Sequence, residues 1–245
     1  ADMLGCEFIA TGHYAQVREE NGRYVISKGL DESKDQSYAL WGVTQECLKR
    51  TIFPIGKYHK KDIKQIAIDR GYIALAEKNE SYEICFIPDN DYRGFLKRKV
   101  GGLEEKVKGG NFVTIKGDAI GTHDGYPFYT IGQRKLGVSL GKDPTYVIGI
   151  NPEKNTVVVG SKEDLKKQEM FVRDINYLKY PKIKDGMECL VKVRYKHKGE
   201  KARVTNDGEN LKVLFHKKVE GIAPGQSAAI YEGNDLIAGG FILKK

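Results

Sequence analysis

The sequence predicts an α/β region over residues 1–93, a mixed α+β region over 94–160 and an antiparallel β-barrel over 161–245. Three observations predict this order. A short apolar strand near the N-terminus is followed by helical spacing, glycines cluster after residue 100, and the last third alternates apolar and polar residues. The chain has 245 residues, 40% of them hydrophobic, which is enough for two or three small domains with buried cores.

The α/β region begins with an apolar run, Cys6–Ala10, that reads as a strand of a parallel sheet. Such a strand is normally buried on both faces, and no βαβ partner precedes it. We therefore expect a larger part of the domain to lie before residue 1. Residues 14–17 and 23–27 are expected to pair as a hairpin, because Asn21-Gly22 between them favours a tight turn.

Four helices are expected next. Ser33 can cap a helix that reaches about residue 43, and a second short helix covers 44–50. Apolar residues at helical spacing around 63–67 indicate a third helix, which Gly71 ends. The fourth covers about 92–99, where three basic residues suit its C-terminal dipole.

The remaining two regions are read from short strands. In the central region we expect strands over 111–116, 145–150 and 155–160. In the last region apolar and polar residues alternate strictly from Met187 to Lys196, and a turn at Asn206–Gly208 follows. Further strands are expected over 211–215, 226–231 and 237–243. Several short alternating strands with turn signals are typical of a small antiparallel barrel.

Charge favours a polyanionic partner. The chain carries 41 Lys and Arg against 33 Asp and Glu, which gives a net charge of +8. Nucleic acid fits this surplus, because each neutralised phosphate releases counterions and strengthens binding. The charge alone does not decide between nucleic acid and other partners, since many soluble proteins are mildly basic.

Cysteine and histidine spacing excludes several classes of site. The four cysteines (Cys6, Cys47, Cys85 and Cys189) form no C-x-x-C pair, which argues against a zinc ribbon, a thioredoxin-type motif or a dense disulfide framework. The five histidines are scattered, so no metal site is predicted. No apolar run could span a bilayer and no signal peptide pattern is present, so we expect a cytoplasmic protein without a membrane partner.

An ordered set of motifs identifies a family. The segments are Ala10–Ala15, Lys34–Tyr38, Phe53–Gly56, Glu80–Ile87, Tyr129–Lys135 and Ala223–Ser227. Each motif is weak alone. In this order and spacing they resemble the tRNA-specific 2-thiouridylase family, and the resemblance covers essentially the whole chain.

The resemblance implies a fold and a reaction. The α/β region would be the C-terminal part of a PP-loop nucleotide-binding domain, which uses ATP, with Mg²⁺ expected, to adenylate the 2-oxygen of the wobble uridine of certain tRNAs. A cysteine persulfide then delivers sulfur, and a second cysteine assists its release. In the family, the phosphate-binding loop and that second cysteine lie upstream of the strand that matches Cys6–Ala10. We therefore do not assign the second role to Cys6, and we expect this chain alone to be inactive.

By the same resemblance, Cys85 is the persulfide-bearing cysteine. The chemistry needs an accessible thiolate that can accept, hold and release a sulfane sulfur. Sulfur would come from a persulfide donor or a relay protein. The local sequence by itself favours a different interpretation, a buried core cysteine between Ile84 and Phe86, because free cysteine is among the most buried residue types.

The resemblance also assigns binding residues to the α/β region. Gly12 would contact ATP, because a missing side chain lets the backbone approach a nucleotide closely; the alternative is an ordinary strand-ending glycine. His13 would contact tRNA, or be a turn histidine. Lys34, Asp35 and Gln36 would also contact tRNA, since Lys meets phosphate while Asp and Gln bond base or ribose edges. Locally, a charged helix start explains those three residues equally well.

Three more tRNA contacts fall in the barrel. They are Arg194, Tyr195 and Gln226. The alternation places Arg194 on the solvent face, which suits a phosphate contact, and Tyr195 on the core face, where it would pack. Gln226 could equally be a turn residue after Pro224-Gly225.

The resemblance therefore implies an ATP-dependent 2-thiolation of the wobble uridine of tRNA. The alternative is a non-catalytic RNA-binding module in which Cys85 is structural. An RNA methyltransferase is disfavoured, because no glycine-rich loop follows a strand as a methyl-donor site would require.

Overall fold

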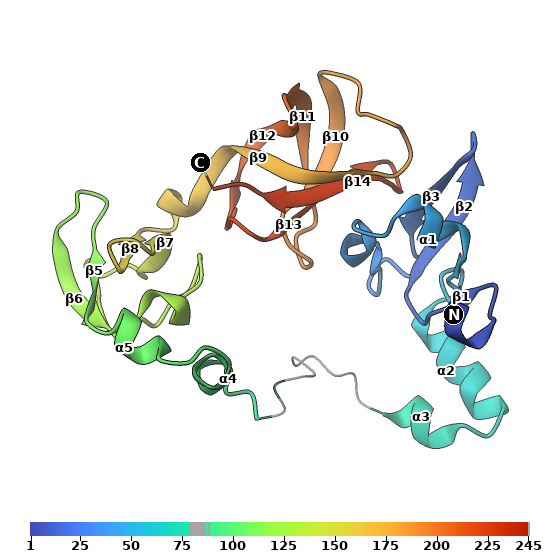
Figure 1. Cartoon of the computed structure of the whole chain (residues 1–245), viewed down its shortest axis with the longest axis horizontal. Helices are drawn as coiled ribbons and strands as arrows, with labels where there is room; N and C mark the ends of the chain where they lie inside the picture. Colours follow the sequence, from blue (N-terminus) through green and yellow to red (C-terminus); the bar gives the residue numbers. More distant parts are fainter. Residues whose placement is uncertain (79–86, 88, 245) are drawn as a thin grey trace. The chain divides into compact units, whose positions relative to one another are not determined.

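The structure is a computed structural model that describes residues 1–78, 87 and 89–244. The chain divides into two compact units, of which the first joins the N-terminal region to the barrel (Figure 1). The first unit comprises Ala1–Lys78, Gln168–Lys218 and Ala223–Lys245, and the second comprises Asn79–Lys167 and Val219–Ile222. The predicted order of α/β region, mixed region and antiparallel barrel is confirmed. The domain boundaries 1–93, 94–160 and 161–245 stay predictions.

A parallel strand pair opens the first unit. After a 3-10 helix, Asp2–Leu4, strand β1 (Ile9–Ala10) pairs in parallel with β4 (Thr51–Ile52). The amide of Ile9 donates to the carbonyl of Arg50 at 2.8 Å, and the amide of Thr11 donates to the carbonyl of Ile52 at 3.1 Å. The predicted parallel strand is therefore present, although it is shorter than Cys6–Ala10.

The predicted hairpin is confirmed and belongs to the barrel sheet. Strands β2 (Ala15–Glu20) and β3 (Arg23–Lys28) pair antiparallel. Asn21 and Gly22 have φ values of 52° and 73°, and positive φ at both central residues is what a type I′ turn requires. Strand β3 also pairs with β14 (Asp235–Ile242) at the far end of the chain. The hairpin thus extends the barrel sheet rather than the parallel pair.

The predicted helix from Ser33 to about residue 43 is wrong. The chain forms a turn over 31–34 and then a 3-10 helix, Ser37–Leu40. Ser33 does not cap a helix, because its hydroxyl bonds the Asp31 carboxylate at 2.6 Å. Short polar side chains that bond nearby groups in this way offer the backbone an alternative to a helix.

The other expected helices of the first unit are present. Helix α1 (Gln45–Lys49) is capped by Thr44, whose side chain accepts the amide of Cys47 at 3.3 Å. Helix α2 (Lys60–Asp69) ends before Gly71, which has a φ of 83°. A short helix α3 (Ile73–Glu77) follows.

Six strands close the barrel. In spatial order they are β13, β10, β11, β12, β9 and β14, and β13 pairs with β14 to complete the ring. The bounds are β9 Lys166–Tyr177, β10 Met187–Lys192, β11 Glu200–Asp207, β12 Asn210–Glu220 and β13 Ser227–Glu232. The interior is filled by fully buried side chains such as Val191, Val204 and Ile230. The sequence did not predict β9 or β11.

The second unit has a four-stranded sheet in the order β6-β5-β8-β7. Its elements are α4 Tyr92–Lys99, α5 Leu103–Val107, β5 Gly110–Val113, β6 Ala119–His123, β7 Tyr146–Asn151 and β8 Thr156–Gly160, with 3-10 turns at Tyr126–Phe128 and Glu163–Leu165. Phe112, Val147 and Val157 lie in its core. Across the described part of both units, no helix is long and apolar enough to cross a membrane.

Candidate nucleic-acid interface

Three segments that carry predicted RNA contacts meet at the side chain of Tyr38 in the first unit. The Tyr38 hydroxyl donates to the carbonyl of Ser227 at 2.8 Å, and Ser227 directly follows Gln226. The Tyr38 ring lies edge-on to the ring of Tyr195, with 6.3 Å between centroids. Residues 34–36 precede Tyr38 along the chain. Side chains from the α/β region and from two places in the barrel therefore share one surface.

Asp35 orders this surface from inside. Its side chain is buried, with 8% of the residue exposed. One carboxylate oxygen accepts the amides of Gly29 at 3.2 Å and Ser37 at 3.1 Å, and the other accepts the Ser37 hydroxyl at 3.0 Å. These bonds satisfy both oxygens within the protein. Asp35 therefore holds the segment in shape here, and its contact with tRNA stays a prediction.

A hydrogen-bonded chain connects this carboxylate to the barrel. Because the Ser37 hydroxyl donates to Asp35, it accepts from the hydroxyl of Tyr231, which lies 3.0 Å away on β13. Burial raises the pKa of Tyr231, and burial also raises the pKa of Tyr38 to about 12. Both phenols thus stay neutral donors at physiological pH. The surface is rigid because every member of the chain is buried and bonded.

Gln36 connects this surface to Tyr14, which lies between β1 and β2. Its side-chain oxygen accepts the amide of Tyr14 at 3.0 Å, and its own amide donates to the carbonyl of Tyr14 at 2.9 Å. His13, the neighbour of Tyr14, lies with Nδ1 2.9 Å from the hydroxyl of Thr11 and its ring edge-on to Phe53. The predicted contacts His13 and Gln36 are therefore joined through one residue.

Gly12 lies exposed beyond the carboxyl end of β1. A Cβ placed on it would come near only Ile55 Cδ1, at 4.0 Å. Packing does not require a glycine here, and the space beside its backbone is open. This fits close approach of a nucleotide, so the predicted ATP contact is compatible with the structure.

The expectation that Tyr195 faces the barrel core is wrong, since 47% of the residue is exposed. The alternation of inward and outward side chains holds only while the chain is a strand, and β10 ends at Lys192. Beyond Val193, which is fully buried, the chain turns and the amide of His197 donates to the carbonyl of Arg194 at 3.0 Å. Arg194 is exposed as expected.

Gln226 is also exposed, next to a fixed backbone. Its amide donates to the carbonyl of Ala223 at 3.1 Å, and its carbonyl accepts the amide of Ile242 at 2.8 Å. Gly225 has a φ of 83°, which turns the chain into β13. The side chain of Gln226 therefore projects from a position held by the barrel.

The sequence did not indicate that Tyr38, Tyr231 and Lys192 belong to the site. Lys192 Nζ lies over the Tyr38 ring, 5.6 Å from its centroid. Tyr38 closes the motif Lys34–Tyr38, and that place was the only sequence signal for its role. The other two are ordinary members of alternating strands until the fold brings them beside residues far away in the chain.

The predicted sulfur carrier, Cys85, lies outside the described residues. Of the described cysteines, Cys6 and Cys47 are exposed and Cys189 is buried. Burial raises the pKa of Cys189 to about 12, which keeps its thiol protonated and unreactive. None of these three is assigned the carrier role.

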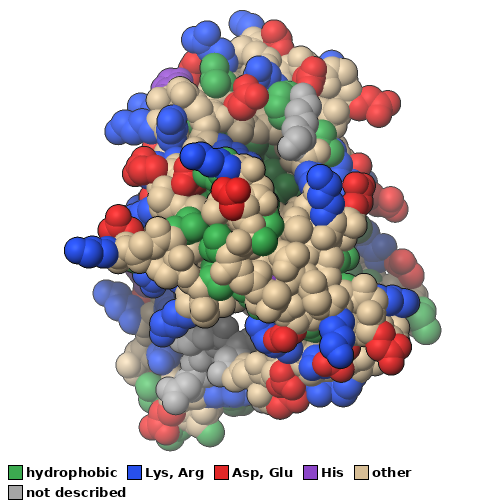
Figure 2. Space-filling view, turned by 90° about the vertical axis from the view of Figure 1, so that its left-hand side faces the viewer, with side chains coloured by type: hydrophobic (Ala, Val, Ile, Leu, Met, Phe, Trp, Pro, Cys, Tyr) green, Lys and Arg blue, Asp and Glu red, His purple; other side chains and the backbone are tan. Residues whose placement is uncertain are grey.

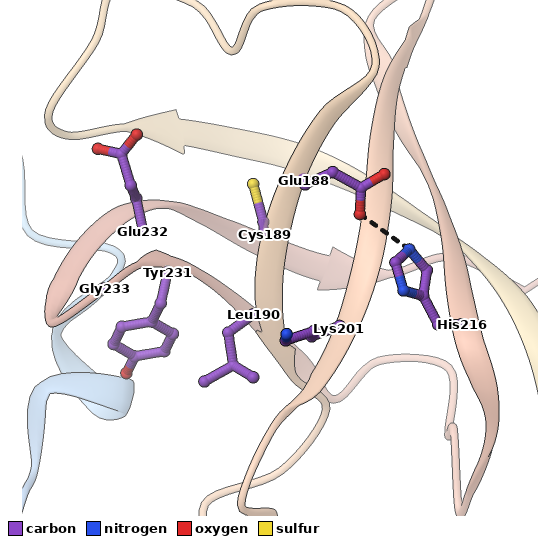
Figure 3. Close-up of a pocket in the computed structure, with 8 residues that line it drawn as sticks. All are labelled: Glu188, Cys189, Leu190, Lys201, His216, Tyr231, Glu232 and Gly233. Atoms are coloured by element: carbon purple, nitrogen blue, oxygen red, sulfur yellow. Dashed lines mark ion pairs between the residues drawn. The ribbon is translucent and has the colours of Figure 1, made fainter.

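Cys189 lines a pocket of about 470 Å³ on the barrel (Figure 3). Figure 3 shows Glu188 pointing toward His216, and their carboxylate oxygen and Nε2 are 2.8 Å apart. Glu232 on the opposite wall accepts from Lys179 at 2.8 Å and from Tyr180 at 2.7 Å. These groups already bind one another, so the pocket shows no set of side chains poised for chemistry.

Charge is mixed over much of the surface. Figure 2 shows acidic and basic side chains intermingled on the face drawn, so RNA binding must be argued from local clusters rather than from a continuous basic face. Within the described ranges, no group of three or more His, Cys, Asp or Glu side chains is placed to hold a metal ion. No residue is therefore assigned to Mg²⁺.

Comparisons with known proteins agree with these observations. Residues 1–89 match the family model described as "tRNA methyl transferase HUP domain", residues 93–161 the "tRNA methyl transferase PRC-barrel domain", and residues 167–242 the "Aminomethyltransferase beta-barrel domain". A tRNA-specific 2-thiouridylase MnmA of Cytophaga hutchinsonii is 56% identical over 99% of this chain and 66% of its own length. The protein of the same name in Amoebophilus asiaticus is 55% identical over 99% of this chain and 65% of its own length.

A third relative, tRNA-specific 2-thiouridylase MnmA 1 of Clostridium botulinum, is 46% identical over 99% of this chain and 68% of its own length. The chain thus spans about two thirds of the length of the curated relatives it matches. The resemblance drawn from the ordered motifs is confirmed over nearly the whole sequence. This chain belongs to the tRNA-specific 2-thiouridylase family.

Proposed function

We propose that this chain takes part in the ATP-dependent 2-thiolation of the wobble uridine of tRNA, and that the surface around Tyr38 holds the anticodon region. This surface, called the Tyr38 surface below, comprises Tyr38 and the neighbouring residues 34–36, 194–195 and 226. The observation that carries the proposal is the meeting of three separate segments at Tyr38. These segments contain the residues expected to contact RNA. The similarity to relatives named tRNA-specific 2-thiouridylase supports the same reaction class.

The exposed side chains have the chemistry that unpaired RNA needs. Tyr195 offers an exposed ring on which a base can stack. Arg194 suits a phosphate, and the amide of Gln226 can bond a base edge through both a donor and an acceptor. Behind them, Asp35 and the Tyr38 hydroxyl hold the supporting backbone in place.

Gly12 is proposed to lie against bound ATP, whose chemistry is to convert the uridine 2-oxygen into a leaving group. Cys85 is proposed to carry the incoming sulfur as a persulfide, supplied by a persulfide donor or a relay protein. A cytoplasmic location is part of the proposal, because this chemistry needs cysteines that are kept reduced.

The test is made in the full-length enzyme. We expect Cys85→Ser to abolish 2-thiouridine formation in an assay with ATP and a persulfide donor, read by mass spectrometry of the tRNA nucleosides. Binding of tRNA should stay within about twofold of wild type, because the Tyr38 surface is unchanged. Cys47→Ser, which replaces an exposed cysteine, is the matched control and should retain activity.

Normal thiolation by Cys85→Ser would contradict the assignment of the sulfur carrier. A Cys85 thiol that resists alkylation in the folded protein, together with intact tRNA binding, would favour the alternative of a non-catalytic RNA-binding module. A wild-type protein that does not bind tRNA would contradict the proposed role of the Tyr38 surface.

A further inference from the structure

Two lysines lie beside the Tyr38 surface on a floor of tyrosine rings. Lys28 ends strand β3 and Lys192 ends strand β10. The ammonium of Lys28 lies 5.2 Å from the centroid of the Tyr231 ring, and that of Lys192 lies 5.6 Å from the centroid of Tyr38. The exposed ring of Tyr195 is 6.0 Å from the Lys192 ammonium. Two strands that are distant in sequence thus deliver two cations to one place.

Neither lysine forms an ion pair with a described carboxylate. Among the residues that the structure describes, no Asp or Glu oxygen lies within 4.0 Å of either ammonium. The carboxylate that acts on Lys192 at longer range is Asp35, and its oxygens already accept from Gly29 and Ser37. Several other partly buried cations of this unit are paired with carboxylates; Lys179, for example, meets Asp235 at 2.7 Å.

This arrangement is electrostatically unfavourable as it stands. Burial lowers the pKa of Lys192, and repulsion from Lys28 lowers it further, against the attraction of Asp35. The tyrosine faces compensate the charges in part through cation–π attraction. Holding two like charges together on a rigid floor costs stability, and an anion placed between them would remove that cost.

We propose that Lys28 and Lys192 together hold one backbone phosphodiester of the bound tRNA. The inference rests on the proposed function and adds to it a phosphate contact made by residues outside the recognised motifs. Lysine is a compact point charge and binds phosphate in that manner. With the phosphate held on this floor, the adjoining nucleotide lies beside Tyr195, whose half-exposed ring can stack a base.

The experiment measures the affinity of the 245-residue chain for a tRNA transcript with a wobble uridine, over a range of salt concentrations. The variants are Lys28→Met, Lys192→Met and the double variant, because methionine keeps the apolar stem on the ring and removes the charge. Lys217→Met is the matched control. It changes an exposed lysine on β12, which lies across the barrel ring from β13.

We expect each single variant to bind about fivefold to tenfold more weakly at low salt. The slope of log K against log salt should fall by about 0.7 in the double variant, the value for one phosphate of an unpaired strand rather than two. The two single losses should not multiply, because both lysines hold the same phosphate. Lys217→Met should match wild type in affinity and slope.

A thermal midpoint measured for each variant shows that it is folded. Removal of either charge should leave the midpoint unchanged or raise it, since it relieves repulsion; if a methionine variant unfolds, the glutamine variants replace it. If the wild-type chain binds tRNA and the double variant has the same salt slope and affinity, the proposed phosphate contact is wrong but the proposed function is not. A wild-type chain that binds no tRNA at any salt concentration would overturn the proposed function and this inference together.

Discussion

Asp235 fastens the β2–β3 hairpin to the barrel, and its replacement by asparagine tests that attachment. The carboxylate accepts from both terminal nitrogens of Arg18 at 2.9 Å, from the Ser27 hydroxyl at 2.7 Å and from Lys179 at 2.7 Å. Arg18 and Ser27 belong to the hairpin, whereas Asp235 begins β14. Asparagine keeps the shape of the side chain and removes its charge.

The expected loss of stability on Asp235→Asn is about 2–3 kcal/mol. Breaking a fully buried ion pair costs about 3–5 kcal/mol, whereas an exposed pair costs less than about 1. Here the side chains of Asp235 and Lys179 are 14% and 15% exposed, but that of Arg18 is 44% exposed. Lys179 also keeps its bond to Glu232 at 2.8 Å. A value between the two limits follows.

The pH dependence has a definite sign. Burial alone would raise the pKa of Asp235, but hydrogen bonds from Arg18, Lys179 and Ser27 outweigh it and hold that pKa well below its usual range. A depressed carboxyl pKa gives stability that is present above the unfolded value of about 3.9 and is lost as the pH falls through the folded value. The difference between wild type and Asp235→Asn should be constant near neutral pH and shrink only in acid.

Thermal unfolding followed by circular dichroism measures this effect. The midpoint of Asp235→Asn should fall by about 5–10 °C at neutral pH. Glu188→Gln is the control, because Glu188 and its partners Arg203 and His216 have side chains that are 49%, 61% and 50% exposed, and it should cost less than about 0.5 kcal/mol. A midpoint for Asp235→Asn equal to that of the control would refute the role given to this network.

Two further predictions concern backbone space and thiol reactivity. Gly56→Ala should destabilise the first unit by about 3 kcal/mol or more, because the added Cβ would lie 1.8 Å from the carbonyl oxygen of Ala15. Denaturant unfolding measures this loss. Gly12→Ala, whose Cβ meets only Ile55 Cδ1 at 4.0 Å, should unfold like wild type. Equal effects of the two substitutions would contradict the packing described. Iodoacetamide should label exposed Cys6 in the folded protein and spare Cys189, whose pKa burial raises to about 12; fast labelling of Cys189, read by peptide mass spectrometry, would show that its strand opens.

Local chemistry made part of the fold predictable. The Asn21-Gly22 turn was evident because the positive φ values it needs are tolerated by those residue types. The strand around Cys189 was evident because one buried face imposes a period of two. Where the strand ended, the same rule failed, and Tyr195 was assigned to the wrong face.

Long-range pairing made the rest unpredictable. The sequence does not show that β3 would pair with β14, since no local pattern marks a partner so far along the chain. The helix expected after Ser33 is absent for a local reason instead: the Ser33 hydroxyl bonds Asp31, and Asp35 accepts the amides of Gly29 and Ser37. In the candidate site, the motif residues could be named in advance, but the tyrosine floor beneath Lys28 and Lys192 could not.

The pairing of β3 with β14 sets the order in which the two units can fold during translation. The hairpin of β2 and β3 must wait for its partner, Asp235–Ile242, so the first unit cannot close until Ile242 has been made. The second unit, by contrast, is nearly contiguous over Asn79–Lys167 and has its own core. It can therefore fold during translation while the early hairpin stays unpaired and exposed, which makes that hairpin the segment most in need of protection by chaperones.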